Sequence, residues 1–353
     1  MNEPNNPVYA QPQVLSPAHP TYAAAPPPRR GSGLLRGLMI LFAVLGVFAV
    51  LLVGGLYLLA SSVSIATTDV WLEEEFHSGD ENSPNKVAIV SVEDMIMDVT
   101  ERHVIRQLKA AEEDDAVKAI VLKVDSPGGT IFSSDHIHRK VQQVCRGPGE
   151  TKPIVVSMQG LAASGGYYVS APANRIFAER TTMTGSIGVI ASFPNVAGLM
   201  EDFKVRMEVI KTGPFKDAGS PFREMTPAER ERWQVVIDDA FERFIEVVSE
   251  GRGMTADEVK KLATGDVYTS REAKASGLVD EIGYIEDAID AAKSLAKISD
   301  AQVIEYKRPL DFLELLLGSA TGRSSKIEID LQSLLRAGVP RVMYLTQAPT
   351  MGL

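Results

Sequence analysis

The run of residues 158–190 could build a serine nucleophile. Ser164 stands among small residues and glycines in AASGGYY, shortly after the apolar run PIVVSM at 153–158. A short, β-branched apolar run predicts a buried strand, so we expect Ser164 where a strand passes into a helix. Its hydroxyl would lie near the free N–H groups of the helix start, and Gly165 and Gly166 would leave room for a substrate backbone. An ordinary serine N-cap explains this segment alone equally well.

A second glycine turn could supply hydrogen-bond donors to an oxyanion. The run DSPGG at 125–129 follows a strand-like run, and Pro127 followed by two glycines forces a turn. Backbone N–H groups of such a turn can face a cleft and bind a negatively charged oxygen. A tight strand-to-helix connection is the common structural use of a Pro-Gly pair, and the turn alone does not separate these two interpretations.

A serine becomes a nucleophile only when a base accepts its proton. His136 and His138 lie two residues apart in an expected helix and so on different faces, and nothing in the sequence directs either toward Ser164. Lysine is the alternative base when burial keeps its amine neutral near pH 7. Lys211 and Lys216 lie in the irregular run VIKTGPFKDAGSPF. By local composition alone, a solvated surface lysine is the favoured interpretation of either.

Composition narrows the function classes. The chain has 353 residues, of which 45% are hydrophobic, so it can bury a sizeable core. Cys145 is the single cysteine, which excludes an intramolecular disulfide and a cysteine metal cluster, and the five histidines form no HExxH pattern. We therefore expect no metal site and no cofactor. The net charge of −10 argues against nucleic acid as a partner.

The amino-terminal part predicts a tail and a membrane anchor. Residues 1–33 are rich in Pro, Asn, Gln and Ala and predict a disordered tail. The segment 34–60 predicts a transmembrane helix, because 24 successive residues from Gly37 to Ala60 carry no charge. Such a helix would span about 36 Å. A cleaved secretion signal is the alternative, but the long tail and the length of the apolar run favour an uncleaved anchor.

Charges that flank the apolar run predict its orientation. Three arginines precede it, whereas Asp69 and the acidic run 73–75 follow it. Basic residues concentrate on the cytoplasmic side of a membrane span. We therefore expect a single-pass protein of the cell membrane, with a cytoplasmic amino terminus and an extracytoplasmic catalytic domain.

After a linker at 61–84, strand-like and helix-like segments alternate, which predicts an α/β domain with a largely parallel sheet. We expect strands at 86–92, 118–124, 153–158 and 206–210, and helices at 103–111 and 134–144.

The following region turns helical. Apolar residues recur at helical spacing from Trp233 to Val248, behind a predicted capping box of Thr226 and Glu229 with Pro227 at the first helical position. Two more Thr-x-x-Glu helix starts follow, and amphipathic runs at 310–317 and 331–335 lie near the carboxyl end.

Five ordered motifs resemble one family. They are DSPGG, AASGGYY, TGSIGV, KTGPFKDAGSPFREMT and GDVYTSREAKASGLVDEIG, and together they cover roughly residues 85–295. In this order they resemble the signal peptide peptidases of the SppA family, far more specifically than any one motif does. The resemblance implies the ββα spiral fold of Clp protease and crotonase in a peptidase domain at 85–297, followed by a C-terminal extension at 298–353.

The resemblance also implies a Ser-Lys dyad in place of a triad. Ser164 matches the family nucleophile and Lys216 the family base, with Lys211 as the near alternative. Ser186, in TGSIGV, matches the serine that orients the lysine amine. Backbone N–H groups of Gly129 and Gly165 would then form the oxyanion hole. Gly128 would shape the turn.

By this resemblance, the protein is a membrane-anchored serine endopeptidase that degrades remnant signal peptides and other short apolar peptides. Family members of similar length form rings, commonly octamers, that share each dyad between adjacent subunits, so we expect a homo-oligomer. A crotonase-like acyl-CoA enzyme is one alternative, disfavoured because no CoA is expected outside the cytoplasm. The other alternative is a catalytically silent membrane scaffold or chaperone ring of the same fold.

Overall fold

The computed structural model describes residues 38–48, 50, 51, 54, 72–149, 151–307 and 342–345. The chain divides into two compact units, Met1–Asp69 and Val70–Leu353. The described residues of the first unit are helical, and their larger apolar side chains are exposed. In the part of the chain that is described, no helix is long and apolar enough to cross a membrane. The tail predicted at 1–33, and the rest of the anchor predicted at 34–60, lie outside the described residues.

The second unit alternates strands and helices. Its strands are β1 (Glu73–Gly79), β2 (Lys86–Glu93), β3 (Val117–Ser126), β4 (Gly128–Thr130), β5 (Ile154–Ala163), β6 (Arg175–Ala178), β7 (Met183–Gly185), β8 (Ile190–Ala191), β9 (Val267–Thr269), β10 (Glu281–Ile282), β11 (Gln302–Lys307) and β12 (Val342–Leu345). Its helices are α2 (Asp98–Glu113), α3 (Ile131–Arg146), α4 (Gly165–Ser170), α5 (Ala197–Asp202), α6 (Pro227–Arg252), α7 (Ala256–Leu262), α8 (Ser270–Ala275) and α9 (Ile285–Ala296).

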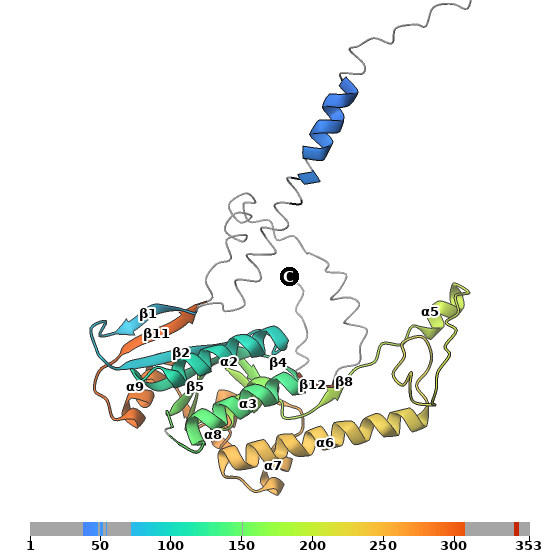
Figure 1. Ribbon diagram of the computed structural model, residues 1–353. Helices are drawn as coiled ribbons and strands as arrows, with labels where there is room; N and C mark the ends of the chain where they lie inside the picture. Colours follow the sequence, from blue (N-terminus) through green and yellow to red (C-terminus); the bar gives the residue numbers. More distant parts are fainter. Residues whose placement is uncertain are drawn as a thin grey trace, which may run out of the picture. The chain divides into compact units, whose positions relative to one another are not determined.

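The central sheet has the strand order β1-β11-β2-β3-β5-β6-β10, and β7 and β9 continue it from β5. Figure 1 shows β1, β11 and β2 side by side at one end of this sheet. Neighbours from β11 to β10 pair in parallel, whereas β1 pairs antiparallel with β11. β5 pairs with β6 in its first half and with β7 in its second half. The predicted α/β class with a largely parallel sheet is therefore confirmed.

Alternate residues of β2 face different layers, because successive side chains of a strand point to opposite faces of a sheet. Val87 and Ile89 are buried in an apolar cluster that includes residues of α9. Ala88 and Val90 are buried in a larger cluster that includes residues of α2, α3, α4 and α6. Helices therefore cover both faces of the sheet, and burial on both faces explains the continuous apolar runs of the predicted strands.

Strands from outside the predicted peptidase domain complete the sheets. β1 lies in the predicted linker at 61–84, and β11 lies in the predicted extension at 298–353, so the central sheet extends beyond 85–297 on both sides. A smaller sheet has the order β4-β12-β8, with antiparallel pairs. These additional strands are short and pair with distant partners, so local sequence patterns do not reveal them.

The capping boxes predicted at Thr226, Thr255 and Thr269 are present at the starts of α6, α7 and α8. By contrast, the strand predicted at 206–210 is wrong. These residues are exposed and form no strand, because no strand among the described residues pairs with them and accepts their backbone hydrogen bonds. They belong to a segment between β8 and α6, residues 192–226, which we call the arm.

One buried hydroxyl tests the packing around α4. Tyr167 is fully buried, and its hydroxyl donates to the Leu278 carbonyl at 2.9 Å. We expect Tyr167→Phe to lower the free energy of unfolding by about 1 to 3 kcal/mol, because the carbonyl loses its partner without gaining water. Urea denaturation measures the loss. Tyr268→Phe is the matched control, since its half-buried hydroxyl donates to Leu262 and the loss should be smaller. Equal losses in both variants would contradict the argument.

Candidate active site

Ser164 lies where β5 ends and α4 begins, as the sequence predicts. Its backbone has φ 53° and ψ −113°, a conformation that costs a non-glycine residue about 1 to 3 kcal/mol. Its N–H donates to the Gly185 carbonyl at 2.7 Å, and its own carbonyl accepts from the Tyr168 N–H at 2.8 Å. Backbone hydrogen bonds on both sides therefore hold the strained residue in place.

The Ser164 side chain stabilises none of the described residues through a hydrogen bond. The residue is 1% exposed, and its Oγ has no hydrogen-bond partner among them. The serine does not cap α4 through its side chain, so the N-cap interpretation is wrong. A buried hydroxyl without a partner carries a free-energy cost and calls for a functional explanation.

The two predicted glycine turns meet beside Ser164. A Cβ atom placed on Gly165 would lie 3.0 Å from the Gly129 nitrogen and 2.6 Å from the Ser134 Oγ. A Cβ atom on Gly128 would lie 2.6 Å from the Gly165 nitrogen. Gly128 also has φ +98°, which glycine adopts without strain. Close backbone contact therefore requires glycine here, and it brings the predicted oxyanion donors, Gly129 and Gly165, next to each other.

Ser126, which sequence reasoning did not single out, holds this turn. Its hydroxyl donates to the Asp94 carbonyl and accepts from the Gly128 N–H at 3.1 Å. The Gly128 carbonyl accepts from the Ile96 N–H at 2.8 Å. The only sequence signal for this role was a serine directly before Pro127.

The strand β12 lines the same turn. Tyr344 pairs in register with Gly129, and its carbonyl oxygen lies 2.2 Å from the position that a Gly128 Cβ would take. The Tyr344 ring is fully buried, stacked on Tyr168 at 4.8 Å between ring centroids and close to Phe244. The sequence left the role of the C-terminal extension open, and this register shows that the extension reaches the site.

Ser186 follows the strand that pairs with the end of β5, next to Ser164. Ala163 on β5 pairs in parallel with Gly185 on β7, so Ser164 and Ser186 follow at equivalent positions. Both serines have positive φ, and the Ser186 hydroxyl donates to the Gly265 carbonyl at 3.1 Å. The structure therefore brings Ser164, Ser186 and the glycine turn into one region.

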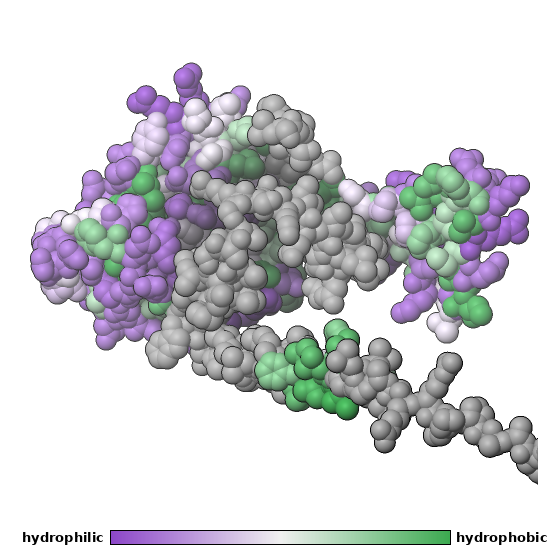
Figure 2. All heavy atoms as spheres, turned by 90° about the horizontal axis from the view of Figure 1, so that it is seen from above, coloured by the Kyte–Doolittle hydropathy of each residue, from purple (hydrophilic) through white to green (hydrophobic). Residues whose placement is uncertain are grey.

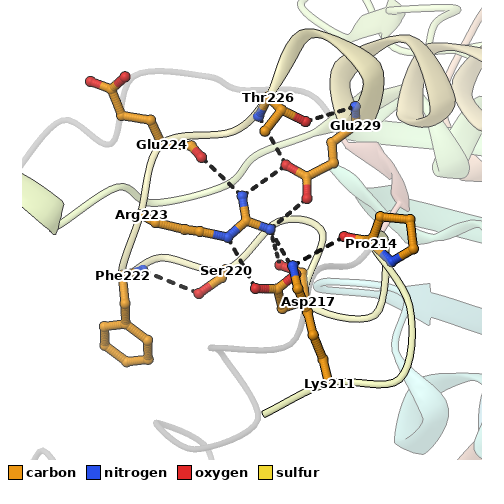
Figure 3. Close-up of polar contacts among 9 residues, drawn as sticks. All are labelled: Lys211, Pro214, Asp217, Ser220, Phe222, Arg223, Glu224, Thr226 and Glu229. Atoms are coloured by element: carbon orange, nitrogen blue, oxygen red, sulfur yellow. Dashed lines mark hydrogen bonds and ion pairs between the residues drawn. The ribbon is translucent and has the colours of Figure 1, made fainter. Parts of the chain in front are cut away.

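Lys216 lies apart, on the arm, which Figure 1 shows projecting from β8 to the amino-terminal end of α6. Lys216 is exposed, and no hydrogen bond or ion pair within the described residues joins its side chain to Ser164 or Ser186. Lys211 is engaged instead, since its amine donates to Asp217 at 2.6 Å and to the Pro214 carbonyl at 3.2 Å (Figure 3). Of the two candidate lysines, Lys216 is the one whose amine is not held by another group of the arm.

Neither histidine of α3 is placed as the base. His136 shares a hydrogen bond with the Glu101 carboxylate at 2.8 Å. His138 is buried with its ring against Tyr168, and burial lowers its pKa to about 4. The described residues contain no group of three or more His, Cys, Asp or Glu side chains that could hold a metal ion.

Because His138 is buried, we expect the folded protein to lose stability in mild acid. The unfolded chain binds a proton at this ring near its usual pKa of about 6.5, whereas the folded protein resists it. Stability is therefore full above about pH 7 and falls as the pH drops through 6.5 toward 4, by about 2 kcal/mol at pH 5. Asp135, Arg243 and Arg146 are the charged groups that face this ring.

Thermal unfolding between pH 7 and pH 5 measures this loss. His138→Gln should flatten the dependence, whereas His77→Gln, at an exposed histidine, should leave it as in the wild type. A wild-type slope in His138→Gln would contradict the prediction.

Comparison with known proteins fits this geometry. A family model described as peptidase family S49 matches residues 149–299, and one described as Clp protease matches residues 81–211. A protein of Enterococcus faecium named "Putative signal peptide peptidase SppA" is 40% identical over 246 residues, which cover 67% of this chain and 70% of that protein. The chain belongs to peptidase family S49.

Two further S49 relatives are longer than the matched region. "Protease 4" of Salmonella typhi is 38% identical over 61% of this chain, and "Serine protease SPPA, chloroplastic" of Arabidopsis thaliana is 32% identical over 65% of it. The match spans 34% of each of these relatives. The resemblance inferred from the five motifs is confirmed, and the family and these names support a serine-type peptidase.

Proposed function

We propose that this S49 protein is a membrane-anchored serine endopeptidase with Ser164 as nucleophile and Lys216 as base. The observation that carries the proposal is the buried, unpartnered Ser164 hydroxyl, held in a strained backbone conformation against the Gly128–Gly129 turn. A serine with a purely structural role would satisfy its hydroxyl and relax its backbone.

In the proposed reaction, the neutral Lys216 amine accepts the Ser164 proton and the alkoxide attacks a peptide carbonyl. The tetrahedral intermediate collapses to an acyl-enzyme when Lys216 returns the proton to the leaving amine. Lys216 then removes a proton from water, the resulting hydroxide attacks the acyl carbonyl, and the bond to the Ser164 oxygen breaks as Lys216 returns the proton to that oxygen, which releases the peptide acid. Ser186 orients the amine. Because an amine is the base, the rate should rise toward alkaline pH.

The glycines would supply the hydrogen-bond donors of the oxyanion hole. Backbone N–H groups of Gly129 and Gly165 would donate to the oxygen of the tetrahedral intermediate, with Gly128 shaping the turn. Such donors commonly lower the barrier by about 3 to 4 kcal/mol each. Their positions need no rearrangement, since the backbone contact between the two turns is already formed.

The arm supports a dyad shared between copies of the chain. Eight large apolar side chains of the arm are exposed, and Figure 2 shows this apolar surface gathered on the projecting segment: Leu199, Phe203, Val205, Met207, Val209, Ile210, Phe215 and Phe222. Exposed apolar surface of this extent marks an interaction site. We propose a homo-oligomeric ring, such as an octamer, in which the arm lies on the neighbouring subunit and brings Lys216 to that subunit's Ser164.

The proposed substrates are remnant signal peptides and other short apolar peptides at the membrane. A pocket of about 860 Å³ opens beside Ser186 and is lined by apolar side chains that include Leu161, Ile187 and Phe241. An apolar cleft of this kind suits an extended, apolar peptide. The uncharged run Gly37–Ala60 supports the membrane anchor.

The dyad is tested by single substitutions and by mixing. Ser164→Ala and Lys216→Ala should each abolish cleavage of a fluorogenic apolar peptide and keep the assembly, whereas Lys211→Ala should stay active. Co-assembly of the two inactive chains should restore about a quarter of the wild-type rate, because one in four neighbouring pairs joins an intact Ser164 to an intact Lys216.

Each outcome of this test separates one claim. Activity in Lys216→Ala together with an inactive Lys211→Ala would show that the base was assigned to the wrong lysine. Inactive single variants without recovery on mixing would place both residues in one subunit. An assembled wild type that cleaves no apolar peptide would favour the scaffold alternative.

The proposed topology is tested by protease protection. Protease added to cells with an opened outer envelope and an intact cell membrane should digest the catalytic domain and spare residues 1–33, because the flanking arginines keep the amino terminus inside. Immunoblots with a tag at each end measure this. A digested amino-terminal tag beside a protected domain would reverse the topology.

A further inference from the structure

We propose that Arg223 is a positioning residue for the Lys216 base, because it ties the loop that carries Lys216 to the first turn of α6. This inference rests on the proposed function, in which Lys216 accepts the proton of Ser164. It assigns a role to a cluster of charged residues in the arm that the proposed mechanism does not otherwise use.

Arg223 joins two carboxylates through one guanidinium group (Figure 3). Its Nε and Nη2 atoms donate to the two oxygens of Asp217 at 3.0 and 2.8 Å, and Nη2 also donates to the Asp217 carbonyl at 3.1 Å. Its Nη1 and Nη2 atoms donate to the two oxygens of Glu229, with the Nη1 contact at 2.9 Å. The planar fork of arginine makes both pairs bidentate, a geometry that lysine lacks.

The two carboxylates belong to the two parts that Arg223 connects. Asp217 directly follows Lys216 in the sequence. Glu229 is the third residue of α6 and the partner of Thr226 in its capping box, where it accepts from the Thr226 N–H at 2.9 Å, and its side chain is only 3% exposed. The other end of α6 is anchored in the core through Phe244 and Val248. A continuous series of contacts therefore runs from the core, through α6 and Arg223, to the residue beside the base.

The arm has no apolar core of its own, so this network of charged side chains holds it together instead. Within residues 192–226, all of which the structure describes, Gly219 is the only buried residue. Arg223 and Lys211 beside Asp217 hold the pKa of that carboxyl well below its usual range. Arg223 and the Thr226 N–H likewise lower the pKa of Glu229 to about 2. Both carboxylates therefore stay ionised wherever a neutral lysine base can work.

The same network gives the two lysines of the loop different contacts. Lys211 pairs with Asp217, so its charge is used inside the network. Lys216 donates only its backbone N–H, to the Gly213 carbonyl at 3.3 Å, and its amine forms no ion pair within the described residues. Arg223 and Lys211 fix the loop from inside, while the Lys216 amine is left available to a neighbouring copy.

The test replaces Arg223 and follows the pH profile of peptide cleavage. A base displaced by about 1 Å costs up to about a hundredfold in rate, so kcat should fall by about 10- to 100-fold in Arg223→Gln, with KM nearly unchanged. The pH dependence of kcat should also change, because a displaced amine lies at a different place relative to Ser164 and Ser186 during proton transfer. Arg223→Lys should recover part of both effects.

Subunit mixing distinguishes positioning from a general loss of structure. In co-assemblies of Ser164→Ala chains, which supply the lysine, with Lys216→Ala chains, which supply the serine, Arg223→Gln should lower the recovered activity by the same factor, about 10- to 100-fold, only when it is added to the lysine-supplying chain. Arg232→Ala, at an exposed arginine of α6, is the matched control and should leave every rate unchanged.

The outcomes identify which proposal fails. A lower rate with an unchanged pH profile, and an equal loss on either chain, would overturn the positioning role and leave the proposed function intact. Full activity of Lys216→Ala would overturn the proposed function itself. If Arg223→Gln does not assemble, as judged by size-exclusion chromatography, the same measurements are made on Arg223→Lys. A wild-type kcat and a wild-type pH dependence in Arg223→Lys would then overturn the proposal.

Discussion

The site depends on one backbone contact, the approach of the Gly128–Gly129 turn to Gly165. No side chain fits at any of these positions, because each Cβ atom would lie within 3.0 Å of backbone or side-chain atoms. The contact brings the end of β3 and the end of β5 together, and it holds Ser164 at the amino terminus of α4 with its hydroxyl free. β3 and β5 are parallel neighbours, so their carboxyl ends lie side by side and the two turns that follow them can meet.

The strain at Ser164 is sustained by its surroundings. The hydrogen bonds from Ser164 to Gly185 and from Tyr168 to Ser164 belong to an otherwise regular strand and helix, so relaxing φ at Ser164 would break both. Tyr168 in turn packs on Tyr344 from the far end of the chain. Strain at functional sites persists where the rest of the fold over-determines it, and this arrangement is an example.

The arm follows a different principle. It is ordered by the Asp217–Arg223–Glu229 network and by the capping box of α6, while its apolar side chains face outward. A segment built in this way is suited to pack on another copy of the chain. The contrast between an enclosed serine and an exposed lysine is the physical basis for proposing that the two residues meet between subunits.

Elements with local signals could be predicted from the amino-acid sequence. Continuous apolar runs predicted β2, β3 and β5, Thr-x-x-Glu patterns predicted the starts of α6, α7 and α8, and the order of five motifs identified the family. The positions of Ser164 and of the glycine turns followed from strand ends and glycines. The dyad itself, the membrane anchor and the oligomer stay predictions.

Contacts between residues far apart in the sequence became known from the three-dimensional fold. It excluded a side-chain N-cap at Ser164, removed the strand expected at 206–210, and paired β12 with the Gly128–Gly129 turn. It also showed that Asp217 holds Lys211 and that Arg223 joins Asp217 to Glu229. Such contacts arise from how helices and strands are placed in space, and no periodicity or spacing along the chain encodes which charged or aromatic side chains will meet.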